Sequence, residues 1–458
     1  MTGARLAQAP VDLEQVSLRA VEVALSAGAD DAEAWSEEST GRQIRVYQGA
    51  VESLTDATSR GLGVRAFSAG RVGYASGTDL SAGGIAALAS AAHAAAVAVD
   101  VDEHQGLPEQ CGATPVEGLS SSDVGSWPTE RKVDLAVTIE RVARAHPAVS
   151  QVEDAVYADE EERIALANSS GFCAAYERTS AWAYASAFAG EGSELMTGQG
   201  IGTGRGPAAL DPAAIGCEAA ERAAALTGAR KPASRHCPVL LDAFVAAAFI
   251  GYIGAMLSAD AVQRGRSPFA DREGDEIATA ALQLADDGVD PAGLASAPFD
   301  GEGSARRRTP LIEGGRLRTF LFDARSARKA GRATTSNASR RSYRSPPSVG
   351  PANLVVEPGT APFDDLVART GNGLYVTDVA GLHSGVNPVS GTFSVGASGR
   401  LVEGGELAGP VRQFTIASDL VSMLRAVAAV GSESRWVPFG GSVRAAPVLL
   451  AEMAVSGS

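Results

Sequence analysis

The chain is poor in lysine, cysteine and histidine, and these shortages narrow what it can be. Lysine occurs only at Lys132, Lys231 and Lys329, so nearly all of the positive charge is carried by arginine. Acidic residues outnumber basic ones by 54 to 39, and the formal charge of −15 argues against a nucleic-acid-binding surface over the whole protein. The four cysteines lack the two-residue spacing of zinc knuckles and redox pairs. The five histidines are scattered, and no two have the i, i+4 or i, i+5 spacing that would place both on one face of a helix.

Long apolar runs are missing as well. No stretch approaches the ~20 apolar residues of a membrane helix, and the longest candidate, Phe244 to Leu257, is short and holds two glycines. Residues 1–10 lack the apolar core of a signal peptide. The sequence therefore predicts a cytoplasmic globular protein.

What is present predicts an α+β protein in three parts. Residues 11–106 and 118–228 each combine helical spacing with alternating, strand-like segments, which predicts two helix and antiparallel-sheet domains. Segments rich in Pro, Gly and Ser separate them, at 107–127 and again at 227–234. Residues 235–458 are predicted to form a β-rich C-terminal domain with one long helix. The helices are expected at 11–27, 83–99, 129–145, 212–226 and 241–269.

Six motifs in the second half of the chain carry a family resemblance. The predicted helix closes on Arg264-Gly265-Arg266-Ser267-Pro268-Phe269. It is followed by Asp286-Asp287-Gly288, Pro298-Phe299-Asp300-Gly301-Glu302-Gly303, Pro351 to Gly359, Gly381 to Ser394 and Pro410 to Ala417. The order and spacing of these blocks resemble the TldD/PmbA family. Asn168-Ser169-Ser170-Gly171 also matches the middle region of that family.

The resemblance implies a metal site that this chain lacks. In TldD-type members the helix carries His-Glu-x-x-x-His, two zinc ligands beside the glutamate that activates the metal-bound water. A gap-free count places these positions at Ile250, Gly251 and Ala255, which offer no donor atom. The family's further cysteine ligand is also absent from the matching stretch 430–442. The chain thus resembles the PmbA (TldE) type of subunit, and we expect no catalytic residues, metal or other cofactor in it.

The same resemblance implies a role in proteolysis. The expected partner is a TldD-type zinc peptidase subunit, which would form a heterodimer with this chain and cut unfolded or extended peptides in a shared cavity. Nucleic acid and membrane are not expected as partners, and a homodimer is conceivable without the partner chain. Two alternatives remain open: a peptide-binding or chaperone-like module without hydrolysis, and a self-contained hydrolase that uses Ser or Cys.

Two segments supply candidate binding residues. His383 either lines the peptide channel or pins a loop, with Ser384 and Asn387 capping the neighbouring turns. The segment 325–356 holds seven basic residues and no acidic one, among them Arg340, Arg341 and Arg344. Its composition predicts a flexible loop near 331–350. Three roles remain open for this segment: it contacts nucleic acid, it contacts the carboxylates of a peptide or partner, or it is a solvated loop without a binding role.

Overall fold

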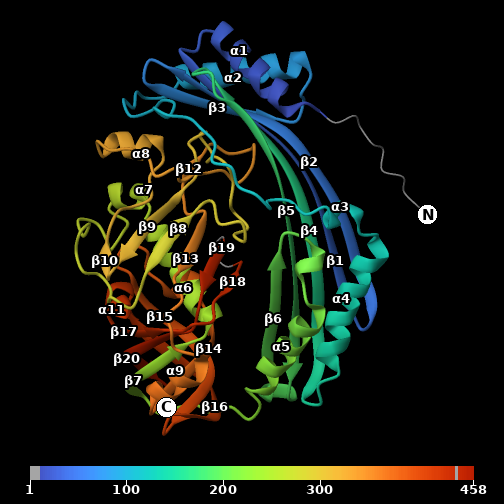
Figure 1. The fold of residues 1–458 in the computed structure, drawn as a ribbon, viewed down its shortest axis with the longest axis vertical. Helices are drawn as coiled ribbons and strands as arrows, with labels where there is room; N and C mark the ends of the chain where they lie inside the picture. Colours follow the sequence, from blue (N-terminus) through green and yellow to red (C-terminus); the bar gives the residue numbers. More distant parts are fainter. Residues whose placement is uncertain (1–10, 439–441) are drawn as a thin grey trace.

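The computed structural model describes residues 11–438 and 442–458 and shows a mixed α+β fold. A long curved sheet with helices on its outer side forms one lobe, and the C-terminal domain lies within the concave side of that sheet (Figure 1). None of the helices in the described part of the chain is both long and apolar enough to cross a membrane.

One antiparallel sheet runs through both regions that were predicted as separate helix and sheet domains. Its strand order is β3-β2-β1-β4-β5-β6, so β1 of the first region pairs directly with β4 of the second. The pairing extends from Glu33 to Val46 without a register shift. The two regions therefore contribute strands to one sheet. Its strands are β1 (Asp31–Tyr47), β2 (Ala50–Ser68), β3 (Arg71–Gly77), β4 (Val149–Asn168), β5 (Cys173–Ala189) and β6 (Met196–Gly204).

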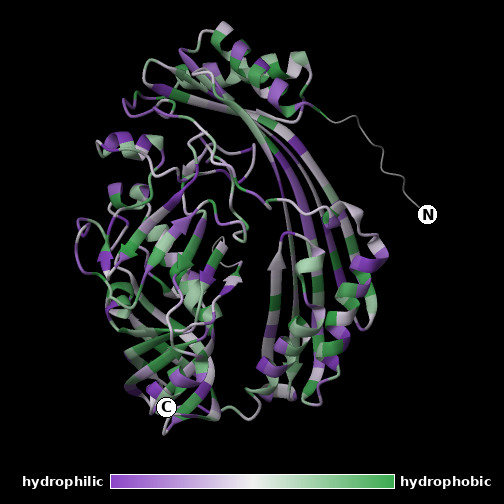
Figure 2. Ribbon diagram, in the orientation of Figure 1, coloured by the Kyte–Doolittle hydropathy of each residue, from purple (hydrophilic) through white to green (hydrophobic). Residues whose placement is uncertain are grey.

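Five helices cover one face of this sheet. Even-numbered residues of β1, such as Ala34 and Ile44, pack against them, as the two-residue alternation of a strand requires. Helix α1 begins after Asp12, whose carboxylate accepts the N–H of Gln15 at 3.0 Å. Along α4, hydrophobic and hydrophilic residues alternate (Figure 2). The helices are α1 (Leu13–Ser26), α2 (Ala82–Val97), α3 (Asp123–Ser126), α4 (Thr129–Arg144) and α5 (Pro212–Ala224), which confirms the four helices predicted before residue 230.

The C-terminal domain contains two larger sheets. In one, the order is β16-β15-β14-β7-β20-β17, and an additional pairing of β16 with β20 closes it into a barrel. The other has the order β10-β9-β8-β13-β19-β18, and β11 pairs with β12 separately. The strands are β7 (Arg235–Leu241), β8 (Leu284–Asp287), β9 (Arg308–Glu313), β10 (Arg316–Leu317), β11 (Ala338–Ser339), β12 (Ser348–Val349), β13 (Asn353–Val356), β14 (Gly373–Ala380), β15 (Thr392–Glu403), β16 (Glu406–Asp419), β17 (Val427–Val430), β18 (Arg435–Val437), β19 (Ser442–Ala445) and β20 (Val448–Ser456).

The long helix predicted over 241–269 is shorter than expected. Leu241 ends β7, and the helix α6 occupies only Ala243–Met256. A new short helix, α7 (Ala259–Gln263), starts because the hydroxyl of Ser258 accepts the N–H of Ala261. Helix α6 contacts strands of both larger sheets, which explains why it is apolar nearly all round. The remaining helices are α8 (Ala324–Lys329), α9 (Phe363–Thr370), α10 (Leu382–Gly385) and α11 (Leu420–Arg425), with short 3-10 turns η1 (Gly192–Glu194) and η2 (Pro207–Ala209).

Candidate functional site

The candidate site is an apolar cavity of about 550 Å³ against one face of α6. Residues of α6 spaced at three and four line it, as expected for a single helical stripe. Its polar groups are few, and a volume in this range is typical of ligand-binding pockets. The lining residues are Phe244, Val245, Ala248, Gly251, Tyr252, Ala255, Thr377, Asp378, Val379, Leu382 and His383.

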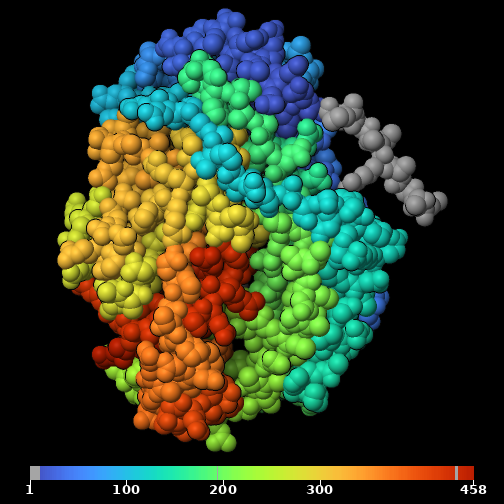
Figure 3. All heavy atoms as spheres, in the orientation of Figure 1, coloured from blue at the N-terminus to red at the C-terminus, as the bar shows by residue number. Residues whose placement is uncertain are grey.

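A second cavity, of about 360 Å³, adjoins the first. Both are lined by Phe244, Thr377 and Asp378, and we call the two cavities together the cleft. The second cavity is completed by residues of β6, which brings the curved sheet to the cleft. Figure 3 shows a groove between the green β6 and α5 region and the red and orange C-terminal elements.

Strand β6 offers main-chain hydrogen-bonding groups to this groove. It is the last strand of its sheet, so one of its edges pairs with no other strand of the described residues. The N–H of Ile201 donates to Glu218 at 3.4 Å and its carbonyl accepts from Arg435 at 2.8 Å, which shows that these groups point to the free edge. In an antiparallel strand, the main-chain N–H and C=O groups of residues two apart point to the same edge. The main-chain groups of Thr197 and Gln199 therefore also point to the free edge.

The three positions that correspond to zinc ligands and base do not fit a metal. Gly251 and Ala255 line the cleft, whereas Ile250 is buried in the core of the C-terminal domain, 4% exposed. A hydrogen, a methyl group and a butyl side chain present no lone pair. Among the described residues, no three His, Cys, Asp or Glu side chains come together as a metal site. The stretch 430–442, where a cysteine ligand was sought, includes residues 439–441, which lie outside the described residues.

The structure brings one of the three residues of the His383 motif to the cleft. His383 is exposed and lines the first cavity, as one of its two predicted roles requires. The hydroxyl of Ser384 donates to the carbonyl of Gly381 at 3.3 Å. The side chain of Asn387 accepts the N–H groups of the residues two and three positions on, at 2.9 and 3.1 Å. Ser384 and Asn387 therefore hold turns beside the cleft and do not line it.

The basic segment is not the flexible loop that its composition suggested. Strands β11 and β12 pair within it, and the side chain of Tyr343 is 1% exposed. Its ring packs on Gly61 of β2, where a Cβ atom would meet it at 2.1 Å. The N–H of Tyr343 donates to Glu37 at 3.0 Å, and Tyr74 donates to its carbonyl at 2.6 Å. The segment thus packs on the curved sheet and connects the two lobes. Glycine at position 61 of β2 leaves the space that the ring of Tyr343 occupies.

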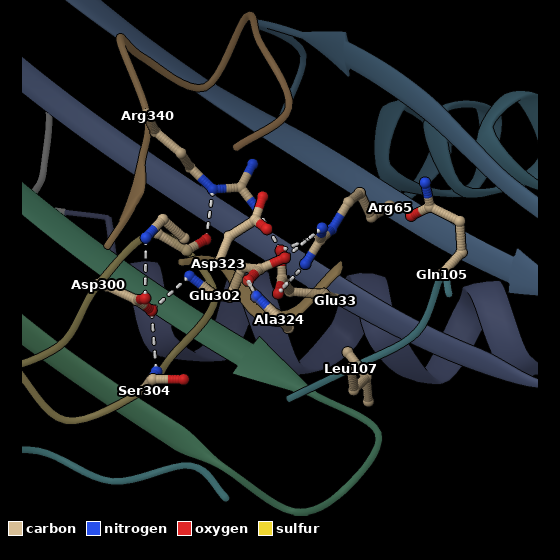
Figure 4. A network of polar contacts seen from close by, with 12 residues as sticks. Glu33, Arg65, Gln105, Leu107, Asp300, Glu302, Ser304, Asp323, Ala324 and Arg340 are labelled. Carbon is tan, nitrogen blue, oxygen red and sulfur yellow. Dashed lines mark hydrogen bonds and ion pairs between the residues drawn. The ribbon is translucent and has the colours of Figure 1, made fainter. Parts of the chain in front are cut away.

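Arg340 belongs to a buried chain of charges between the lobes (Figure 4). Its side chain is 1% exposed, forms an ion pair with Glu33 of β1 and donates to the carbonyl of Gly301 at 2.7 Å. Arg65 of β2 lies between Glu33 and Glu302, at 2.8 Å from each. We call Glu33, Arg65, Glu302 and Arg340 the interlobe network. Burial and internal pairing make Arg340 unavailable to a peptide carboxylate in this arrangement.

One further carboxyl group, that of Asp300, supports this region. Asp300 is buried, and its oxygens accept the N–H groups of Glu302 and Ser304 at 2.9 Å and of Ala338 at 3.0 Å. Desolvation by burial, with the nearby charge of Glu302, raises the pKa of Asp300 to about 6. The motif that contains Asp300 and Glu302 is visible in the sequence, but the pairing of Glu302 with Arg65 is not, because the two residues are 237 positions apart.

The other two arginines differ from Arg340 in a testable way. Arg341 and Arg344 are exposed, and Arg344 lies over the ring of Tyr343 at 5.1 Å. Replacing either by alanine is expected to change the free energy of unfolding by at most about 0.5 kcal/mol, as at other exposed positions. Arg340→Ala is expected to cost about 3 kcal/mol, because it leaves Glu33 with one buried partner fewer. Urea unfolding of the three variants measures the difference, and equal effects would contradict the internal role of Arg340.

His236 and Cys237 do not form a nucleophile and base pair. Cys237 is buried at 6% exposure, and desolvation raises the pKa of its thiol. His236 is exposed, and its Nδ1 lies 3.1 Å from Glu452. Neighbouring side chains on β7 point to opposite faces, as expected for a strand.

Comparison with known proteins agrees with this fold along the chain. Three family models match, described as PmbA/TldA metallopeptidase domain 1 at 32–96, the central domain at 122–227 and the C-terminal domain at 234–457. The chain is 28% identical to "Metalloprotease PmbA" of Escherichia coli O157:H7, over 97% of this chain and 96% of that protein. It is 27% identical to a "Metalloprotease PmbA homolog" of Haemophilus influenzae, over 98% and 96%. The crystal structure of TldE from Thermococcus kodakarensis shares the fold, with a TM-score of 0.88, 21% identity and coverage of 95% and 99%.

Proposed function

The chain belongs to the PmbA/TldA metallopeptidase family, and we propose that it is a metal-free subunit that binds extended peptides for cleavage by a zinc-bearing partner chain. The partner is a TldD-type peptidase subunit, and the two chains form a heterodimer in the cytoplasm. The proposal includes no nucleic acid, no membrane and no cofactor in this chain.

The observation that carries the proposal is the face that α6 presents to the cleft. In the zinc-bearing members implied by the sequence resemblance, this helix holds the metal, but here Ala248, Gly251 and Ala255 present only hydrogen and methyl groups. Amide hydrolysis needs an activated nucleophile and stabilisation of the developing oxyanion, and zinc provides both. The first cavity of the cleft has the volume of a ligand-binding pocket, but the face of α6 that lines it offers no zinc ligand. This combination supports binding without catalysis.

The shape of the cleft suits an extended peptide. The free edge of β6 can add a strand through main-chain hydrogen bonds, which hold a peptide with little regard to its sequence. The apolar lining from α6 then accepts side chains that project from the added strand. A peptide that reaches Ile201 has to displace the contacts from Glu218 and Arg435. A folded protein has no free extended segment to offer, so the cleft favours unfolded chains.

Filling the cleft tests peptide binding. Ala248 lines the first cavity and is half-buried, so Ala248→Phe places a ring in the hollow. We expect the affinity for a labelled unfolded peptide, measured by fluorescence anisotropy, to fall at least about tenfold, because steric exclusion outweighs the ~1.4 kcal/mol that a tenfold change represents. Ala87→Phe, on the exposed side of α2, is the matched control and should leave binding unchanged. Unchanged binding by a folded Ala248→Phe variant would remove the cleft from the proposal.

A further inference from the structure

One carboxylate stands in the cleft where its two cavities meet. Asp378 lines both, and its side chain is exposed to the hollow. It lies on β14 at a shift in the pairing register with β15, between Val376 and Asp378. Such a bulge redirects side chains at functional edges of sheets. Asp378 is the one carboxylate among the residues that line the cleft. The other titratable lining residues are Arg222, which pairs with other acidic side chains, His383, Tyr184 and Tyr252.

The charge of Asp378 has no side-chain partner in the described part of the chain. Desolvation by burial raises the pKa of Asp378. Arg222 exerts an electrostatic influence, but its guanidinium pairs with Asp242 at 2.9 Å and with Glu218 at 3.3 Å. A carboxylate in this setting gains free energy from a cation that arrives with a ligand, because that cation offsets the cost of desolvation.

The surroundings of Asp378 suit a cation on an apolar stem. Phe244 and Tyr252 line the same hollow, together with Val379 and Leu382. Aromatic faces attract ammonium and guanidinium groups, and the methylene stems of lysine and arginine pack on apolar walls. Phe244 already contacts two guanidinium groups of this chain, Arg222 and Arg435, each 4.4 Å from its ring centre. Among the described residues no cation lies over Tyr252, so its ring is the aromatic face that a cation of the ligand would meet.

We propose that Asp378 gives the cleft a preference for peptides with a positively charged group, which its carboxylate binds while the apolar stem lies against α6. The inference rests on the proposed function and adds the class of residue that the cleft selects. The group is the side chain of a lysine or arginine within the peptide, and a free amino terminus offers the same chemistry.

Three peptides of one extended sequence test this preference. The first is capped at both ends and has an internal lysine, the second has norleucine at that position, and the third has norleucine and a free amino terminus. We expect the isolated chain to bind the lysine peptide about tenfold more tightly than the capped norleucine peptide, as one charge-assisted contact permits. In Asp378→Asn the lysine peptide should fall to the level of the norleucine peptide, whose own affinity stays unchanged. Asp364→Asn, on the exposed side of α9, is the matched control.

Each outcome has one consequence. A gain for the free amino terminus that Asp378→Asn abolishes supports the same site, with the terminus as the cation. Equal binding of all three peptides, or a preference for a positively charged peptide that survives Asp378→Asn, overturns the role of Asp378 and leaves the proposed function standing. If none of the peptides binds, the proposed function fails instead.

Discussion

The isolated chain is expected to show no cleavage of an unfolded peptide above background. A mixture of this chain with a zinc-bearing family member is expected to cleave the peptide at least about a hundredfold faster than the isolated chain does. The lower bound is modest, because loss of a metal that generates the nucleophile and polarises the carbonyl removes several kcal/mol of transition-state stabilisation. In this chain the positions of the zinc ligands and the base are occupied by Ile250, Gly251 and Ala255, which have no donor atom in their side chains. The experiment assays this chain alone, the partner alone and the two together, with elemental analysis of zinc in each.

The controls separate the competing functions. A chelator should abolish cleavage by the mixture, and the isolated chain should hold far less than one zinc per molecule after dialysis. Chelator-insensitive cleavage by the isolated chain would make it a self-contained hydrolase. If the mixture forms no complex and cleaves no faster than the partner alone, the chain acts as a peptide-binding module without hydrolysis.

Arg65→Met is expected to lower the free energy of unfolding by about 3–5 kcal/mol, the cost of removing one partner from a buried ion pair. Arg65 is 6% exposed at its side chain and lies between Glu33 and Glu302, which are 0% and 2% exposed. Without its guanidinium both carboxylates lose a buried counter-charge. Arg340 and the N–H of Ala324, at 2.9 Å from Glu302, compensate only in part. Urea unfolding followed by circular dichroism measures the loss.

An exposed ion pair provides the control for this substitution. Arg19 pairs with Glu22 at 2.9 Å, but the two side chains are 61% and 65% exposed. Solvent screens such a pair, so Arg19→Met should change the free energy of unfolding by at most about 1 kcal/mol. Equal effects of the two substitutions would contradict a stabilising role of the interlobe network. A large effect of Arg65→Met alone would show that the ion pairs between the curved sheet and the C-terminal domain stabilise the folded chain.

Local structure followed from the sequence where neighbouring residues decide it. The helix predicted at 129–145 is α4 within one residue, and the helix predicted at 11–27 is α1 within two residues. Periodicity fixes such elements because an amphipathic helix or strand needs only residues a few positions apart. The break after Met256 was missed, because it depends on how Ser258 and Ala259 meet Leu321 of another segment.

Residue identity by itself determined the family and the absence of donor atoms at positions 250, 251 and 255. Only the tertiary structure decided that β1 pairs with β4 in one sheet, that Arg340 is buried against Glu33, and that Asp378 stands in the cleft. Arg340 and Arg341 are adjacent and chemically identical, yet one is internal and the other exposed. The physical reason is that burial and ion pairing depend on segments hundreds of residues apart, which meet only when the two lobes pack.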